Sequence, residues 1–270
     1  MFYSLSCQAQ IAVSDDYGNR VALASPAARI VSLAPHLTEL LYAAGAGSRV
    51  VGAVDYSDYP PQARALPRVG SDAGIDLEAV LALRPDLVVA WPNAGTRRAI
   101  DRLAELGPPL FRSEPRELED IAATLERLGA LAGTSPLALR AACEFRARKD
   151  ALEKRFSARP KVRVFYQVWD RPLQTVNGDH VISKVMRLCG GENVFAAAPL
   201  LAPEVNAEEV LRANPDVVLT SNSAAAAPPG LGRSRLHYIP AELIQRHTPR
   251  LLDGAERVCQ ALDSARAARS

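Results

Sequence analysis

The sequence predicts an α/β protein of two Rossmann-like lobes, each with a central parallel sheet, joined by one long rigid interdomain helix. Short apolar runs alternate with amphipathic stretches in both halves, as in parallel strands connected by crossover helices. A stretch that begins at Ser135 runs to Pro160 without a helix breaker. One fourteen-residue segment occurs twice, at 77–90 and 207–220, which indicates a matching element in each lobe.

The repeated segment has the same structural pattern in both copies, LEAVLALRPDLVVA and AEEVLRANPDVVLT. An amphipathic turn or two of helix precedes a proline, which cannot continue the helix, and a short apolar strand of the buried parallel kind follows. The offset is 208 − 78 = 130 residues, and six of fourteen positions are identical: Glu78/Glu208, Val80/Val210, Leu81/Leu211, Pro85/Pro215, Asp86/Asp216 and Val88/Val218.

The N-terminal segment, residues 1–25, begins with the apolar, small-residue stretch MFYSLSCQAQ. Two interpretations are open: the tail of a secretory signal peptide that lacks its basic start, or a plain disordered terminus. We favour the first. SLSC also loosely matches a lipoprotein cleavage site, although Ser4 stands where an aliphatic residue is expected.

The first lobe is predicted over residues 26–134. An apolar strand from Ile30, a helix after Pro35, glycines that end the helix and a second strand at 50–54 form a βαβ unit. The lobe continues with the first copy of the repeated segment, a helix ending at Gly107, the strand PPLFR and a helix over 117–132.

The interdomain helix is predicted over residues 135–158, with Ser135 as N-cap and a proline at its first position. A helix of about 22 residues is about 33 Å long. The second lobe, residues 159–270, restarts the alternation with the strand VRVFYQVW and the helix ISKVMRLCGG. The repeated segment, a strand near 237–239 and a final helix from about 249 to 266 follow.

Composition excludes several classes of protein. The chain has 270 residues and a net charge of only +2, unlike a basic nucleic-acid binder. No apolar run reaches the eighteen or so residues that a membrane-spanning helix needs. The sequence contains no G-x-S-x-G, P-loop or H-E-x-x-H motif, and its four histidines lack metal-cluster spacing. We therefore expect a monomeric binding protein without cofactor or catalytic residues. The alternatives are a chelatase-like enzyme and a sensor receptor on the same architecture.

Aromatic residues follow several predicted strands, where ligands of parallel sheets bind. Tyr56 follows the second strand of the first lobe and Trp91 the third, whereas Trp169 ends a strand of the second lobe. Aromatic faces suit a large, flat, partly apolar ligand. They could instead pack against loops, but for the two tryptophans we favour ligand contact.

The segments RIVSLAPHLTELLYAAG, DYSDYPPQA, LEAVLALRPDLVVAW and CGGENVFA resemble the helical-backbone solute-binding proteins of bacterial ABC importers, in particular those that bind cobalamin. The resemblance covers roughly residues 28–265. It implies a periplasmic or lipid-anchored protein that delivers cobalamin or another corrinoid to a permease dimer with its ATPase. Haem and ferric siderophores, which other members carry, are the second choice.

The resemblance also implies site residues. Tyr56 and Trp91 match aromatic ligand contacts, Arg246 matches an arginine near the ligand, and Glu242 falls where an aspartate is expected. Three further aromatic contacts are not kept and fall on Asp72, Gln174 and Ala202. Trp169 is a candidate replacement, so the identity of the ligand stays open between corrinoids and other chelates.

His36 begins a helix directly after a strand and a proline. It could ligate a corrinoid cobalt or hydrogen-bond the ligand, or it could be an ordinary helix-start histidine; both interpretations are open. Cys189 and Cys259 match the two cysteines of the similar proteins, which implies a disulfide, and Cys143 is then free.

Glu78 and Glu208 begin the two repeated helices, where the helix dipole favours a carboxylate by about 0.3–1 kcal/mol. In the similar proteins these positions carry acidic residues that meet arginines on the two permease subunits. We therefore expect the repeat to supply transporter-docking contacts rather than the ligand site.

Overall fold

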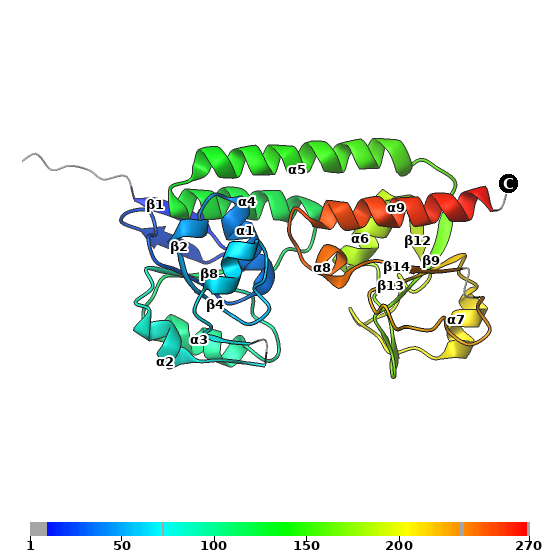
Figure 1. Cartoon of the computed structure of the whole chain (residues 1–270), viewed down its shortest axis with the longest axis horizontal. Coiled ribbons are helices and arrows are strands. Elements are labelled where there is room, and N and C mark those ends of the chain that lie inside the picture. The colour runs from blue at the N-terminus through cyan, green and yellow to red at the C-terminus, as the bar shows by residue number, and fades with distance from the viewer. Residues whose placement is uncertain (1–9, 72, 233–234, 269–270) are drawn as a thin grey trace, which may run out of the picture. The chain divides into compact units, whose positions relative to one another are not determined.

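The computed structural model describes residues 10–71, 73–232 and 235–268, which form two compact units. Unit 1 contains the described residues up to Pro115 together with Asp120–Cys143, and unit 2 contains Arg116–Glu119 and the residues from Glu144 onward. Helix α5 (Ser135–Phe156) contributes to both units and has the 22 residues expected of the connecting helix (Figure 1). Among the described helices, none is both long and apolar enough to cross a bilayer.

Unit 1 is built on a four-stranded parallel sheet. Its strands β4 (Val50–Ala53), β3 (Ile30–Ser32), β7 (Leu87–Ala90) and β8 (Leu110–Arg112) lie in the order β4-β3-β7-β8. Every residue of β3 and β7 is buried, and all of them except Ser32 are apolar, as expected of parallel strands that are covered on both faces. The prediction of a parallel α/β sheet is confirmed.

Helices cover both faces of this sheet (Figure 1). Helices α2 (Leu77–Ala82) and α3 (Arg97–Glu105) contribute Val80, Ile100 and Leu103 to a core cluster with strand residues. The other face is covered by α1 (Pro35–Ala43) and α4 (Leu118–Ala132). The remaining elements of unit 1 are η1 (Gly47–Arg49), η2 (Pro61–Ala65), β5 (Gly70–Ser71) and β6 (Gly74–Ile75).

Unit 2 repeats the strand order of unit 1. Strands β12 (Gly191–Asn193), β9 (Val162–Gln167), β13 (Val217–Thr220) and β14 (Leu236–Tyr238) form a parallel sheet in the order β12-β9-β13-β14. Counted from the first strand of each sheet, both orders are 2-1-3-4. Helices α6 (Val181–Leu188), α7 (Ala207–Ala213), α8 (Ala241–Ile244) and α9 (Leu251–Ala267) and the hairpin β10 (Trp169–Asp170) and β11 (Leu173–Gln174) complete the unit.

The disulfide that the resemblance implies is present in unit 2. Cys189 at the end of α6 is bonded to Cys259 on α9, at a sequence separation of 70. Both cysteines are fully buried, and the bond joins the two helices on one face of the sheet. Cys143 is free and exposed.

The repeated segment is the helix before the third strand, and that strand itself, in each unit. Asp86 accepts hydrogen bonds from the backbone N–H of Arg29 at 2.8 Å, and Asp216 accepts one from the N–H of Arg163 at 2.7 Å. Each arginine in turn donates to carbonyl oxygens at the end of the repeated helix, α2 or α7. The shared aspartates therefore fasten the first strand of each sheet to the third.

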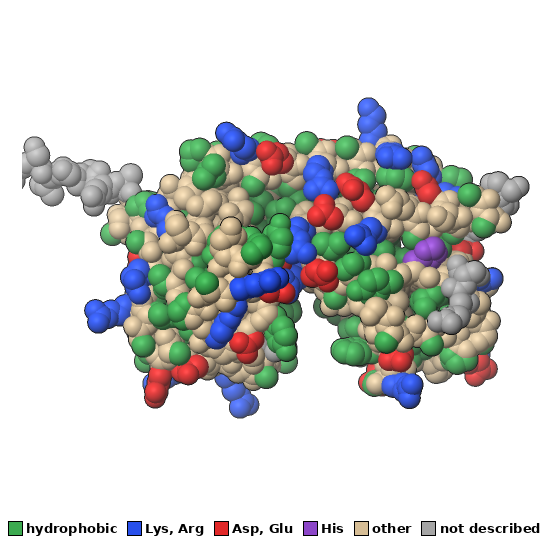
Figure 2. Space-filling view, in the orientation of Figure 1, with side chains coloured by type: hydrophobic (Ala, Val, Ile, Leu, Met, Phe, Trp, Pro, Cys, Tyr) green, Lys and Arg blue, Asp and Glu red, His purple; other side chains and the backbone are tan. Residues whose placement is uncertain are grey.

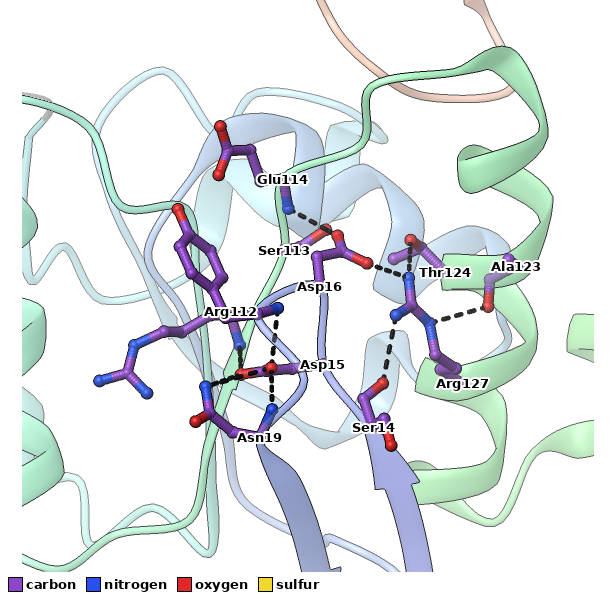
Figure 3. Close-up of polar contacts among 11 residues, drawn as sticks. Ser14, Asp15, Asp16, Asn19, Arg112, Ser113, Glu114, Ala123, Thr124 and Arg127 are labelled. Atoms are coloured by element: carbon purple, nitrogen blue, oxygen red, sulfur yellow. Dashed lines mark hydrogen bonds and ion pairs between the residues drawn. The ribbon is translucent and has the colours of Figure 1, made fainter.

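A hairpin within the N-terminal segment packs on unit 1. Its strands β1 (Ile11–Ser14) and β2 (Arg20–Leu23) are antiparallel, and Leu23 is buried. Asp16 in its turn accepts hydrogen bonds from Ser113 Oγ and Glu114 N and pairs with Arg127 of α4 at 2.6 Å (Figure 3). The hairpin is thus fixed to the end of β8 and to α4. The segment 1–25, predicted as a possible signal-peptide remnant, thus contributes its later part to unit 1, whereas residues 1–9, with Cys7, lie outside the described residues.

Candidate functional site

Both sheets have a topological switch point between their first and third strands. The helix that follows β3 covers one face of the unit 1 sheet, and the helix that follows β7 covers the other (Figure 1). Such a divergence opens a crevice at the carboxyl ends of the two strands, where ligands of open α/β sheets bind. The strand order of unit 2 places its switch point between β9 and β13.

In unit 1, Trp91 and His36 meet at this switch point. Trp91 directly follows β7, and His36 lies in the first turn of α1, which follows β3. Their ring centroids are 5.5 Å apart and the planes are inclined by 78°, an edge-to-face contact. Trp91 keeps 36% of its surface exposed, whereas His36 keeps only 6%. The indole is therefore the accessible ring, and the imidazole lies against it.

The loop that carries Trp91 is shaped by its own side chains. Asn93 Oδ1 accepts hydrogen bonds from the backbone N–H groups of Gly95 and Thr96. Thr96, which is almost fully buried, donates from Oγ1 to the carbonyl oxygen of Trp91 at 3.2 Å. These bonds fix the backbone at the tryptophan before α3 begins.

Tyr56 projects from the loop after β4 and is 75% exposed. Its φ of 60° lies in the left-handed region, which bulky residues rarely adopt. The loop is held from beneath: Thr38 Oγ1 donates to Ser57 Oγ at 3.1 Å, and Arg68 donates to the carbonyl oxygens of Val54 and Ser57. Strained, exposed aromatic residues on well-anchored loops are found at ligand sites more often than at random. Asp72, the remaining predicted site residue of this unit, lies outside the described residues.

Unit 2 has a cavity of about 460 Å³ at its switch point. Its wall includes the residue after β13 and side chains from the β10–β11 hairpin, α6 and α8. Among the residues that line the cavity are Trp169, Val176, His180, Ala202, Ser221 and Gln245. The aromatic and aliphatic members suit an apolar ligand face, while the hydroxyl, amide and imidazole groups offer hydrogen bonds.

Two of the predicted site residues, Trp169 and Ala202, line this cavity, and a third, Gln174, contacts both of them. Trp169 lies directly opposite Gln174 in the β10–β11 hairpin, and Gln174 Nε2 donates to the carbonyl oxygen of Ala202 at 3.2 Å. Trp169 is 59% exposed. The one large aromatic ring of this group therefore stands beside the two positions where aromatic contacts of the similar proteins are missing.

His180 lines the same cavity but was missed from the sequence. It is the N-cap of α6, and its Nδ1 accepts a hydrogen bond from the backbone N–H of Ile182 at 3.2 Å. Burial lowers its pKa from 6.5 to about 4. The available signal was positional, because His180 begins the helix after the first strand of its sheet, as His36 does in unit 1.

A buried polar group connects the cavity wall to the sheet. The hydroxyl of Tyr166, on β9, is hydrogen-bonded to Ser221 after β13. Burial raises the pKa of Tyr166, while hydrogen bonds to Ser221 and Gln245 act in the opposite direction. Because Ser221 and Gln245 both line the cavity, this phenol ties two parts of its wall together.

Glu242 and Arg246 lie next to cavity-lining residues rather than within that wall. Glu242 is exposed in the first turn of α8 and follows Ala241, whereas the half-buried Arg246 follows Gln245. Both residues are therefore sequence neighbours of the cavity wall, and their role at the site stays a prediction. Within the described residues, no three His, Cys, Asp or Glu side chains gather as metal ligands would.

Glu78 and Glu208 occupy equivalent exposed positions in the first turns of α2 and α7. Asp76 and Asn206 cap these helices, so the glutamates are not needed as caps. One turn later each helix exposes a leucine, Leu81 or Leu211. Apart from the proline that follows each helix, glutamate and leucine are the repeated identities that neither the sheet cores nor the aspartate contacts explain.

Comparison with known proteins places these features in a family. The model of the family described as "Periplasmic binding protein" matches residues 30–249. The vitamin B12-binding protein of Vibrio campbellii is 36% identical over 251 residues, which is 89% of this chain and 91% of that relative.

Solved structures agree. The crystal structure of the periplasmic vitamin B12-binding protein of Vibrio cholerae has a TM-score of 0.82 at 37% identity, covering 89% of this chain and 98% of that one. The periplasmic haem-binding protein of Roseiflexus sp. shares the fold with a TM-score of 0.75 at 23% identity, covering 88% of this chain and 98% of that one. The fold, the duplicated switch points and these matches lead to one conclusion: the chain belongs to the periplasmic binding protein family.

Proposed function

We propose that this protein is an extracytoplasmic solute-binding protein that captures cobalamin or another corrinoid and delivers it to an ABC importer. The observation that carries the proposal is the pair of exposed tryptophans, Trp91 and Trp169, one at the switch point of each sheet. Relatives with more than a third of their residues identical over most of the chain are named for vitamin B12.

In this proposal exposed aromatic rings supply the apolar ligand contacts. Trp91 and Tyr56 offer ring faces from unit 1, and Trp169 does so from unit 2. Burying a tryptophan face against a flat apolar ring removes large apolar areas from water. His36 acts through Trp91, since the edge contact at 5.5 Å orients the indole and the low exposure of His36 limits its own contact with ligand.

The polar part of the site comes from unit 2. Arg246 and Glu242 next to the cavity offer a donor and an acceptor for polar groups of the ligand. Trp169 stands beside Gln174 and Ala202, so it supplies the aromatic contact that these two positions lack. In this proposal the aromatic side chains that contact the corrinoid differ in part from those of the similar proteins.

A direct test is tryptophan-fluorescence titration of the purified protein with cyanocobalamin, dicyanocobinamide, haem and a ferric siderophore. We expect saturable quenching by the corrinoids. Trp91→Ala and Trp169→Ala should each weaken corrinoid affinity about tenfold or more, because each removes an aromatic contact of more than about 1.4 kcal/mol. Leu106→Ala, an exposed residue at the end of α3, is the matched control and should bind like the wild type. Binding of haem or siderophore without any corrinoid would replace the ligand in this proposal, and release of metal from the chelate would favour the chelatase-like enzyme.

We propose further that Glu78 and Glu208 dock on arginines of the two permease subunits. The support is their equivalence: both are exposed, both lie in the first turn of the repeated helix, and both have an exposed leucine one turn later. A transporter of two like subunits requires two like contacts. Charge pairs at an interface rim set register and association rate more than affinity.

Docking is tested with Glu78→Lys/Glu208→Lys in an uptake assay in cells or in proteoliposomes that contain permease and ATPase. Uptake should fall while corrinoid affinity stays unchanged, because both side chains lie on helices that do not line the unit 2 cavity. Glu105→Lys, an exposed reversal on α3, serves as the control for added charge. Unchanged uptake, or lost ligand binding, would contradict the docking role.

A further inference from the structure

We propose that His180 is a ligand-contacting residue whose Nε2–H donates a hydrogen bond to a carboxamide oxygen of the ligand. The inference deepens the proposed function and rests on it, since it names one polar contact within the corrinoid site. It is carried by three observations: the hydrogen bond that fixes the imidazole, its place in the cavity wall, and the uncharged surroundings.

The hydrogen bond to the helix determines which nitrogen holds the proton. Nδ1 accepts from the backbone N–H of Ile182 at 3.2 Å, as an N-cap side chain does. A neutral imidazole has one acceptor and one donor nitrogen, so the proton must be on Nε2. Nε2 can then donate to a ligand, but it has no lone pair available for cobalt or iron. His180 is therefore a donor and not an axial ligand.

The cavity wall gives this donor a place to act. His180 lines the cavity of about 460 Å³ together with Trp169 and Ser221. Since Nδ1 is held by the amino end of α6, the opposite edge of the ring, with Nε2, is left for the cavity. Among the residues that the structure describes, Nε2 donates to no protein group. A donor in such a position is satisfied by water or by a bound ligand.

The surroundings keep the imidazole neutral. The other residues that line the cavity are Val168, Trp169, Val176, Ile182, Ala202, Ser221, Asn222, Ala241 and Gln245, and none of these carries an ionisable side chain. Burial alone lowers the pKa of His180 to about 4. At neutral pH the group thus presents an uncharged N–H in a partly apolar cavity.

A neutral N–H matches a neutral acceptor. A carboxamide oxygen can be desolvated against it without bringing a net charge into the cavity, whereas a carboxylate would carry its desolvation cost with no cation among the residues that line the cavity. Corrinoids carry carboxamide side chains around the ring, which is the chemistry that this position fits.

Two substitutions separate the donor from the helix cap. His180→Asn keeps a side-chain acceptor at the N-cap, a role that Asn206 already plays for α7 in this chain, but the side chain is too short to reach the ligand. His180→Gln carries an amide N–H near the position of Nε2 and lacks the short capping oxygen. His180→Asn therefore removes the hydrogen-bond donor to the ligand and keeps the helix cap. His180→Gln keeps the donor and removes the cap.

The experiment measures dicyanocobinamide affinity and the urea midpoint of unfolding for both variants and the wild type at pH 7. We expect His180→Asn to weaken binding about fivefold to tenfold with an unchanged midpoint, because one neutral hydrogen bond is lost. His180→Gln should bind within about threefold of the wild type with a lowered midpoint, because a cap is lost. Equal affinity of wild type and His180→Asn would overturn the inference.

Axial ligation is tested separately with diaquocobinamide, whose visible spectrum responds to a nitrogen ligand on cobalt. The donor role predicts the same bound spectrum for wild type and His180→Asn. A spectral shift that is present in the wild type and lost in the variant would show metal ligation and overturn the donor role. If the wild type binds no corrinoid at all, the proposed function itself fails, an outcome distinct from the loss or retention of affinity in one variant.

Discussion

Protonation of His180 should lower the free energy of unfolding of this protein at acid pH. A single substitution of His180 should remove this part of the loss. Burial lowers the pKa of His180 from 6.5 to about 4, so between these values the unfolded chain binds more protons than the folded one. Stability therefore rises with pH across this window and is lost as pH falls through it. The linkage relation gives a loss of about 2 kcal/mol between pH 7 and pH 4.5 from this one group.

The assay is urea unfolding, followed by circular dichroism at pH 7 and pH 4.5, for the wild type and His180→Asn. Asparagine keeps the cap and does not titrate, so the variant should lose about 2 kcal/mol less than the wild type over the same interval. His237, whose pKa burial also lowers, and the carboxylates titrate in both proteins and cancel in this difference. An identical acid loss in the two proteins would refute the assignment of His180 as a buried neutral group.

Two further predictions concern stability. Cys189→Ser/Cys259→Ser should lower the free energy of unfolding by about 4 kcal/mol in the chain-entropy model, because the bond closes a loop with a sequence separation of 70. Urea unfolding with and without reductant measures this change. An unchanged wild-type midpoint under reduction would contradict the prediction. Arg127→Met should lower the free energy of unfolding by about 2 kcal/mol, because Asp16 loses its ion-pair partner at 2.6 Å. Amide hydrogen exchange should then become faster in β1 and β2. Exchange in these strands at the wild-type rate would argue against the contact.

The architecture was predictable because its signals are local. The apolar runs of the sequence form the buried strands β7 and β13. The proline in each repeat separates the helix from the strand, and the run that begins at Ser135 forms the single helix α5. The repeat was also predictable, but its reason was not. Asp86 and Asp216 bind backbone groups 50 or more residues away, which no local pattern reveals.

The candidate site was predictable only in part, for the same reason. Trp91 was identified because β7 ends directly before it. Trp169 was expected to end the first strand of its lobe, but β9 ends at Gln167 and Trp169 begins the β10–β11 hairpin. The contact between Gln174 and Ala202 spans 28 residues and depends on the fold of the β10–β11 hairpin. His180 has an ordinary sequence neighbourhood, and the role proposed for it rests on its burial beside a cavity, which is a tertiary property.

The surface agrees with a small-molecule carrier rather than with a binder of charged polymers. On the face that Figure 2 shows, Lys and Arg side chains are interspersed with Asp and Glu over both units. A net charge of +2 is consistent with this mixture. The face in view therefore carries no extended patch of one sign, and the proposed docking relies on two individual residues, Glu78 and Glu208.

Calorimetric titration of the purified protein with cyanocobalamin tests the central claim most directly. The account predicts saturable binding of one corrinoid per chain, with a negative heat-capacity change from the apolar surface buried at Trp91 and Trp169. Absence of binding to cyanocobalamin, together with tight binding of a chelate that is not a corrinoid, would contradict it.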